Sequence, residues 1–253
     1  MTISNNKKHE IYIMMVLCHL KVSGWSSQDL IQLLCGFNSR QMAHRLLSNM
    51  EKQGLIRRHQ FSLDDGRRKT IWSLSPHGLG MALQPDEDLS AYKLFKPAKF
   101  HFGTYDHEVM LREVQIHCDT FGWADFHYEN TMKIKGQKKP DALVTDKKGQ
   151  IICIECERST KSHIRYQQLT YQHILKLNKG VYHKVLYITP DDAFNRRLQQ
   201  IMMGIESVKH NQRLINIRDE HRKPFTFITM TKFREYAENA RADKQENSVR
   251  NAH

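Results

Sequence analysis

The sequence has few residues of the kinds that mark secreted or membrane-spanning proteins. Its 253 residues include only six prolines, twelve glycines and five cysteines, an odd number. An odd and scattered set of cysteines argues against a disulfide framework and fits reduced thiols in a cytoplasm. No stretch approaches the roughly 20 apolar residues that a membrane span needs. The short apolar run near the N-terminus has no small-residue cleavage site, so we expect neither a membrane span nor a signal peptide.

Acidic residues are scarce relative to basic ones. There are 27 Asp and Glu against 39 Lys and Arg, which gives a formal net charge of +12. This excess favours a polyanionic partner, either nucleic acid or an anionic membrane surface. Hydrophobic residues make up 40% of the chain, enough for the core of one large domain or two modest ones.

One C-x-x-C motif occurs, at Cys153 and Cys156. We expect these residues to lie on a strand, where positions three apart face opposite sides, so the two sulfurs cannot converge on one ion or form a redox pair. The sequence shows no second Cys or His pair with metal-ligand spacing near them. Structural roles are therefore expected for both thiols.

Residues 1–83 are predicted to form a winged helix-turn-helix domain. Three helical patterns, ending near residues 20, 34 and 52, are followed by two strand patterns joined by a turn at residues 64–68. Three helices followed by a basic hairpin are typical of this motif. The segment carries eleven Lys and Arg against five Asp and Glu, half of the excess charge in a third of the length.

The third helix and the hairpin supply the candidate DNA-binding residues. Early exposed positions of the helix would enter the major groove, where Arg pairs with guanine and Gln with adenine. The basic turn would hold phosphates or reach the minor groove. The alternative is a winged helix used for protein contacts, with solvated charges. The candidates are Ser39, Arg40, Gln41, His44 and Arg45 on the helix, and Arg67, Arg68 and Lys69 on the turn.

Residues 84–104 read as a linker, and the character of the chain changes after them. Residues 105–236 show the order helix, three strands, helix, strand, helix, strand, which predicts an α/β (α+β) core with a mixed sheet. Residues 237–253 are polar and are predicted to be a disordered tail.

Four charged residues on or just after the second and third predicted strands of this core are candidates for chemistry. Asp141 begins one strand, Glu155 and Glu157 end the next on a shared face, and Lys161 begins the following helix. Carboxylates at the end of an apolar strand are costly unless they are paired or bound to a cation. Hard oxygen ligands suit Mg²⁺ or Mn²⁺. The alternative is a set of exposed acids in salt bridges with Lys and Arg.

The motif Pro140-Asp141 followed by Glu155-Cys156-Glu157, within this order of elements, resembles the PD-(D/E)xK restriction-endonuclease-like fold. The usual lysine at the third position is Glu157 here. Lys161 could supply the amine instead, and Glu157 could act as a further metal ligand or general base. The resemblance also adds Glu108, from the preceding helix, as a metal ligand.

A winged helix before such a domain more particularly resembles the MobC-type plasmid mobilisation relaxases and related replication-relaxation proteins. Their E-x-(D/E)-R-x-T segment stands here as residues 155–160. The resemblance implies a cytoplasmic, metal-dependent nickase that cuts one strand of double-stranded plasmid DNA at its transfer origin. It also implies mobilisation or coupling proteins as partners. The common relaxase class uses an H-x-H cluster and a catalytic tyrosine, and no H-x-H occurs among the 15 histidines.

Two other functions remain open from the sequence. The first is a plasmid replication initiator or DNA-binding regulator without catalysis, which would bind its origin without a divalent metal. The second is a restriction enzyme that cuts both strands, which would normally need a symmetric dimer. No dimerisation seam is evident in the sequence.

Overall fold

The computed structural model describes residues 5–62, 66, 68–132, 139–210 and 213–239. The chain forms two compact units, Met1–Ile116 and His117–His253, which divide within one long helix. The domain boundaries predicted at residues 83 and 104 stay predictions. No helix in the described ranges combines the length and the apolar character needed to cross a membrane.

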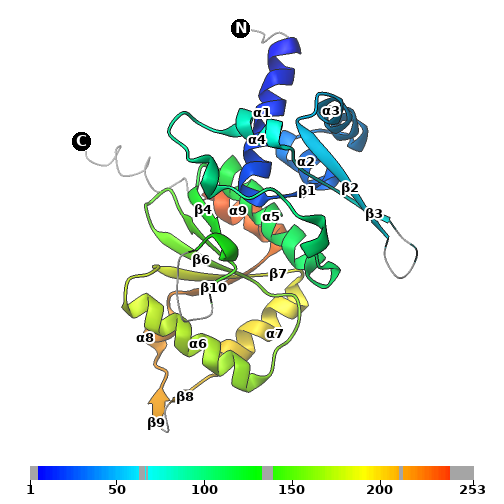
Figure 1. The fold of residues 1–253 in the computed structure, drawn as a ribbon. Coiled ribbons are helices and arrows are strands. Elements are labelled where there is room, and N and C mark those ends of the chain that lie inside the picture. Colours follow the sequence, from blue (N-terminus) through cyan, green and yellow to red (C-terminus); the bar gives the residue numbers. More distant parts are fainter. Residues whose placement is uncertain (1–4, 63–65, 67, 133–138, 211–212, 240–253) are drawn as a thin grey trace, which may run out of the picture. The chain divides into compact units, whose positions relative to one another are not determined.

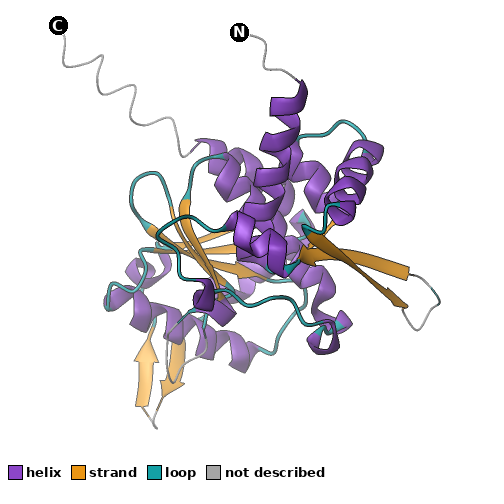
Figure 2. Cartoon of the chain, turned by 45° about the horizontal axis from the view of Figure 1, so that its top comes forward, coloured by secondary structure: helices purple, strands orange, loops and turns teal. Residues whose placement is uncertain are grey.

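The first unit has the predicted winged-helix order, with one further helix after the hairpin. The hairpin β2–β3 extends away from the helices (Figure 2), and β1 pairs with β3 to make a sheet of order β1-β3-β2. The elements are α1 (Asn5–Ser23), β1 (Ser26–Ser27), α2 (Gln28–Cys35), α3 (Arg40–Lys52), β2 (Ile56–Ser62), β3 (Arg68–Leu74) and α4 (Pro76–Ala82).

Serine caps set the starts of these helices. The Ser27 hydroxyl accepts a hydrogen bond from the Leu30 N–H, and the Ser39 hydroxyl accepts one from the Met42 N–H. The sequence did not predict α4, which is capped by Ser75 and has proline at its first position. Gly78 in α4 is required because a Cβ atom there would lie 1.9 Å from the Leu55 carbonyl oxygen.

The segment after α4 packs on the first unit through aromatic rings. It contains three short 3₁₀ turns, η1 (Leu89–Ala91), η2 (Pro97–Lys99) and η3 (Phe102–Thr104). The Phe100 ring lies 5.0 Å from that of Phe61 on the hairpin and 5.2 Å from that of Trp25. A segment predicted as a linker therefore packs against the hairpin and Trp25 through its aromatic side chains.

The second unit is built on a mixed five-stranded sheet of order β10-β7-β6-β5-β4. Strands β4, β5 and β6 are antiparallel, whereas β6, β7 and β10 run parallel. The elements from the shared helix onward are α5 (Tyr105–Thr120), β4 (Ala124–Tyr128), η4 (Glu129–Thr131), β5 (Ala142–Thr145), β6 (Ile151–Cys156), α6 (His163–Asn178), β7 (Lys184–Thr189), α7 (Asp192–Met203), β8 (Ser207–His210), β9 (Arg213–Asn216), α8 (Asp219–Arg222), β10 (Phe225–Thr229) and α9 (Met230–Asn239). The predicted α/β core with a mixed sheet is confirmed.

The tight turn between β5 and β6 fixes the register of these two strands. The Asp146 Oδ1 atom accepts hydrogen bonds from the backbone N–H groups of Lys148 and Gln150. Gly149 has a φ of +76°, a backbone conformation that glycine adopts without strain. This is the hairpin that the sequence predicts for residues 146–150.

Helices cover both faces of the sheet (Figure 1). Helices α6 and α7 bury one face over a cluster that includes Tyr166, Leu198 and Met202. On the other face, Phe233 of α9 packs against His117 at the end of α5 and against Trp123. Consecutive side chains of β6 therefore alternate between two distinct environments.

Three features of the second unit differ from the sequence-based expectation. The β8–β9 hairpin and helix α9 were not predicted. The predicted disordered tail is wrong for residues 237–239, which form the last turn of α9, where Ala237 is fully buried. Residues 240–253 of that predicted tail lie outside the described residues.

Candidate functional site

Asp141 and Glu155 occupy facing positions on neighbouring strands. Ala142 pairs with Ile154 in the antiparallel register, so the next step along the ladder brings Asp141 opposite Glu155. The Asp141 Oδ2 atom accepts a hydrogen bond of 2.8 Å from the Cys156 N–H. The strand pairing thus places opposite each other two residues of the predicted Pro140-Asp141 and Glu155-Cys156-Glu157 motif.

Glu155 is buried on the face of the sheet covered by α6. Only 5% of the residue is exposed, and it pairs with Tyr187 of β7. Its Oε1 atom lies 3.6 Å from Nε2 of His173 on α6. A carboxylate this deeply buried needs a polar or cationic neighbour, and His173 provides one.

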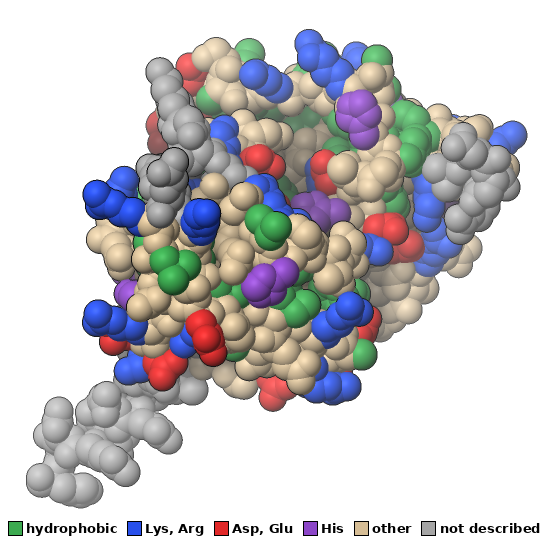
Figure 3. Space-filling model, turned by 90° about the horizontal axis from the view of Figure 1, so that it is seen from below, with side chains coloured by type: hydrophobic (Ala, Val, Ile, Leu, Met, Phe, Trp, Pro, Cys, Tyr) green, Lys and Arg blue, Asp and Glu red, His purple; other side chains and the backbone are tan. Residues whose placement is uncertain are grey.

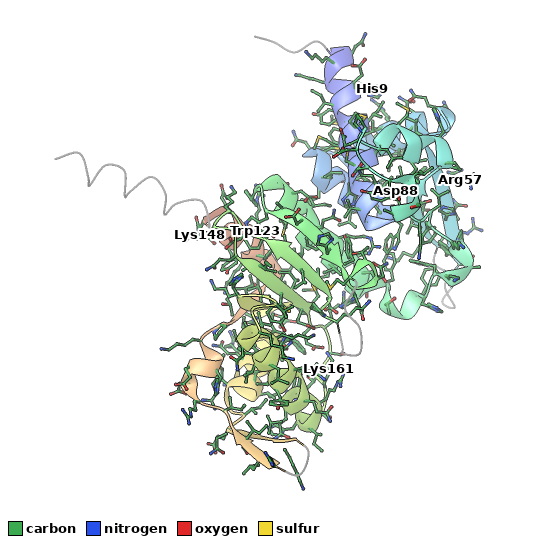
Figure 4. All side chains as sticks on the ribbon, turned by 60° about the vertical axis from the view of Figure 1, so that its left-hand side comes forward. His9, Arg57, Asp88, Trp123, Lys148 and Lys161 are labelled. Atoms are coloured by element: carbon green, nitrogen blue, oxygen red, sulfur yellow. The ribbon has the colours of Figure 1, made fainter. Side chains whose placement is uncertain are left out.

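Glu157 continues the line of β6 and forms an ion pair with Lys161. Its backbone N–H donates a 2.9 Å hydrogen bond to the carbonyl oxygen of Ile188, which keeps the residue beside β7. Its carboxylate pairs with the ammonium group of Lys161, which lies just before α6 (Figure 4). The Lys161 N–H also donates to the hydroxyl of Tyr166, a ring that is fully buried. The ion pair therefore places an ammonium group beside Glu157, the position at which the PD-(D/E)xK pattern has lysine.

The structure gathers a different set of possible metal ligands from the set predicted. Within the described ranges, one group of three ligand-type side chains has all its ligand atoms within 4.8 Å of one another: Cys153, Glu155 and His173. Asp141, Glu155 and Glu157 do not form such a group there. The predicted metal set of Asp141, Glu155, Glu157 and Glu108 stays a prediction.

Glu108 belongs to the first unit, where it is engaged by another residue of α5. Its Oε2 atom lies 2.8 Å from Nη1 of Arg112. The Arg112 guanidinium also donates to the carbonyl oxygens of Ser23 and Trp25 at 2.8 Å each and lies over the Trp25 ring. Within the first unit, Glu108 thus helps to fix a buried arginine.

Sequence reasoning missed His173, which is 16 residues beyond Glu157. A signal for it exists in the helix pattern, because Tyr166, Leu169 and Thr170 share its buried stripe at helical spacing. That stripe must face the sheet, on the side where Cys153 and Glu155 project. Spacing along the chain alone does not show this, since the contact depends on how α6 folds back over β6.

Burial and negative charge keep the neighbouring thiols and phenol protonated. Burial, followed by the charges of Glu155 and Asp141, holds the pKa of the Cys153 thiol well above its usual range. The Cys156 thiol is affected in the same way on the opposite face. Burial and Glu155 likewise raise the pKa of Tyr187. Without a cation, the Cys153 thiol beside Glu155 is therefore neutral.

A polar groove of about 360 Å³ lies in the first unit between α3 and the wing. It contains four of the predicted DNA-binding residues, Arg40, His44, Arg68 and Lys69. Its other lining residues are Ser27, Gln28, Asp29, Arg58, Gln60, Thr70, Trp72 and Tyr105. Helix α3 and the β2–β3 hairpin thus present polar side chains to the same groove.

The remaining predicted DNA contacts lie outside this groove or outside the described residues. Ser39, Gln41 and Arg45 are exposed on α3, with the Ser39 hydroxyl also serving as the helix cap. Arg67 falls outside the described residues. Arg58 lines the groove and Arg57 projects from the same strand (Figure 4). Arg58 was not among the candidates predicted from the sequence, which were taken from α3 and from the turn between β2 and β3.

Inside the groove, the cations have local partners. Arg40 Nε lies 3.1 Å from Asp29 Oδ1 in an exposed pair. The Lys69 ammonium lies 5.2 Å from the centre of the Tyr105 ring. Exposed pairs of this kind are weak, so their cations can exchange partners with little loss. Many Lys and Arg side chains also appear on the face of the molecule in Figure 3.

A family model described as replication-relaxation matches residues 17–180. The chain belongs to the replication-relaxation family. The match spans the winged helix, the strands that carry Asp141 and Glu155, and helix α6 with His173. Membership in the replication-relaxation family points to a role in plasmid replication or mobilisation. No curated protein and no solved structure matches the chain.

Proposed function

We propose that this replication-relaxation protein is a metal-dependent DNA nickase that acts in the cytoplasm on one strand of a plasmid transfer origin, as MobC-type relaxases do. The observation that carries the proposal is the position of Asp141 opposite Glu155, one residue beyond the Ala142–Ile154 pair of β5 and β6. The Glu157–Lys161 pair follows directly after β6. The family match to residues 17–180 supports the plasmid context.

The donor chemistry at this site fits Mg²⁺ or Mn²⁺. Mg²⁺ usually binds through one or two carboxylates and takes its remaining oxygens from water and substrate phosphate. Asp141 is half-buried and Glu155 is buried in facing positions, so these two carboxylates would hold the ion. Such an ion stabilises charge on a phosphate and lowers the pKa of bound water.

The other residues of the site have separate roles in the proposal. Lys161 is one-third exposed, so its ammonium group can contact a DNA phosphate while Glu157 orients it. The buried Glu157 carboxylate keeps the amine next to the end of β6. Glu157 therefore acts through Lys161 as a positioning residue.

In this proposal the first unit finds the site on DNA. Arg40 and His44 of α3 would read base edges in the major groove, and Arg68 and Lys69 of the wing would bind the backbone. The groove that contains all four side chains supports this division of roles. Other mobilisation or coupling proteins would join the complex at the origin.

The second candidate is a plasmid replication initiator or regulator that binds DNA without cutting it. The observation in its favour is that Glu157 already has a cationic partner in Lys161 and that Glu155 lies beside His173. A binding protein needs only the groove of the first unit.

The deciding experiment uses supercoiled plasmid that carries its own transfer origin. A nickase converts it to open circles only when Mg²⁺ or Mn²⁺ is added, and a plasmid without the origin stays supercoiled. Linear product would indicate a restriction enzyme that cuts both strands. Tight, salt-dependent binding with no cutting at any metal concentration would establish the non-catalytic candidate.

A further inference from the structure

The face of β6 that carries Glu155 holds a cluster of three different ligand types. Cys153 and Glu155 lie two residues apart on this face, and His173 reaches them from α6. The three residues are 0%, 5% and 4% exposed, respectively. Their ligand atoms all lie within 4.8 Å of one another, in the part of the chain that the structure describes.

The separations between these atoms are close to those of ligands that share one metal ion. Metal bonds to sulfur, nitrogen and oxygen of about 2.0–2.3 Å in a tetrahedral site put neighbouring ligand atoms about 3.5 Å apart. The Glu155 Oε1 atom lies 3.6 Å from Nε2 of His173, the nitrogen that would bind the ion. The Cys153 Sγ atom lies 3.9 Å from Nδ1 on the other side of the ring, so the thiol would have to rotate toward Nε2 to share that ion.

Two tyrosine hydroxyls lie next to these ligands, where metal sites commonly have hydrogen-bonding groups. The Tyr182 hydroxyl lies 2.7 Å from Nδ1 of His173, a contact of the kind that orients a ligating imidazole. The fully buried Tyr187 hydroxyl, opposite Glu155 on β7, has no hydrogen-bond partner in the described ranges. A metal-bound water would satisfy such a hydroxyl.

We infer that Cys153, Glu155 and His173 form a binding site for a thiophilic divalent transition metal ion of the Zn²⁺ type. Thiolate and imidazole ligands select such ions, whereas Mg²⁺ prefers oxygen alone. Three protein ligands leave a fourth position open. The site differs from the C-x-x-C pair rejected from the sequence, because Cys156 projects to the opposite face of the strand.

This inference does not rest on the proposed nicking activity, although the two sites share Glu155. The hard-ion site uses Glu155 with Asp141, whereas the transition-metal site uses Glu155 with Cys153 and His173. A carboxylate has two oxygens, so one side chain can serve both. An ion bound to Cys153 would then fix the orientation of Glu155 toward Asp141.

The test is cobalt binding by the untagged full-length protein. The protein is refolded from denaturant under reducing conditions with one equivalent of Co²⁺, which admits the ion to a buried site. We expect one bound ion per chain with a near-ultraviolet thiolate-to-cobalt absorption band, displaced by one equivalent of Zn²⁺. Cys153→Ser should lose the band, and His173→Gln should weaken binding by about tenfold or more.

Cys156→Ser is the matched control, because it removes a buried thiol from the same strand on the opposite face. It should keep both the band and the stoichiometry. Asp141→Asn should keep the band even if it abolishes nicking, which separates a failure of this site from a failure of the proposed activity. A wild-type protein without a thiolate band overturns the inference, with no variant needed. A band that survives Cys153→Ser or disappears in Cys156→Ser also overturns it.

Discussion

Glu157 and Lys161 form an ion pair at the end of the central strand, with the carboxylate 6% exposed and the ammonium 33% exposed. The backbone turns between strand and helix over residues 157–161, so the pair links the end of β6 to the segment just before α6. In the proposed nickase, the lysine lies in this turn and not at the third motif position on the strand. Its charge is nevertheless held beside the end of the strand by Glu157.

Removing Lys161 should affect both stability and activity, and a second substitution separates the two. Lys161→Ala leaves the buried Glu157 charge without this partner, which should cost about 1–3 kcal/mol of unfolding free energy. Nicking should fall by at least about tenfold. Lys161→Ala with Glu157→Gln should recover the stability in urea unfolding but not the nicking. Recovery of nicking in the double variant would show that Lys161 acts only structurally.

The groove between α3 and the wing predicts a specific salt dependence of DNA binding. Arg68→Ala with Lys69→Ala should weaken binding and reduce the slope of log affinity against log salt by about 2, because two phosphate contacts are lost. Fluorescence anisotropy with an origin duplex measures this slope. Lys52→Ala, an exposed cation at the far end of α3, is the matched control and should leave the slope unchanged. Equal slopes for the wild type, the double variant and Lys52→Ala would show that the wing does not contact DNA phosphates.

The buried histidine of α1 predicts a loss of stability in mild acid. Burial and the nearby Arg112 charge lower the pKa of His19 from 6.5 to about 3. Because the folded pKa lies below the unfolded one, the unfolded chain binds the proton more readily, and stability falls as pH drops from 6.5 towards 3. At pH 5 this loss amounts to about 2 kcal/mol.

The measurement is urea unfolding of the wild type and His19→Gln at pH 7.5 and pH 5. The wild type should lose about 2 kcal/mol more than the variant between the two pH values. An equal loss in both proteins would mean that His19 does not drive the acid sensitivity.

Two glycines in α4 should respond to alanine in opposite directions. At Gly78 a Cβ atom would meet the backbone carbonyl of Leu55 at 1.9 Å, so Gly78→Ala should destabilise the first unit by about 2 kcal/mol or more. At Gly80 nothing lies within 4 Å, so Gly80→Ala should stabilise the helix by about 0.5–1 kcal/mol. Thermal unfolding of both variants measures the contrast. A stable Gly78→Ala protein would contradict the close packing of α4 against the backbone of Leu55, just before β2.

Local sequence signals were sufficient for most of the fold. Serine caps, a hairpin turn closed by Asp146 and apolar strand patterns predicted the winged helix and the order of elements in the mixed sheet. Helix α4 was missed because its two glycines and proline resemble a loop, although the proline occupies the first turn and Gly78 allows close packing against Leu55. Helix α9 follows β10 without any intervening turn residue, so no signal marked its start.

The candidate site was only partly predictable, because its contacts join distant segments. Asp141 and Glu155 could be paired from the hairpin register. The contact of Cys153 and Glu155 with His173 depends on the path of α6 over the sheet, which no local spacing encodes. The sequence left open whether Lys161 supplies the amine or Glu157 acts as a metal ligand or general base. The structure shows the two side chains in an ion pair.

The central claim is that the carboxylates of the second unit support metal-dependent nicking. Relaxation of supercoiled plasmid carrying the cognate origin, with Mg²⁺ or Mn²⁺, should be compared for wild type, Asp141→Asn and Asp192→Asn. Asp192 is an exposed acid at the start of α7, paired with Lys232, and its variant serves as the control. The proposal predicts open circles from wild type and Asp192→Asn, and loss of at least about 100-fold in rate for Asp141→Asn. Equal relaxation by all three proteins would contradict it.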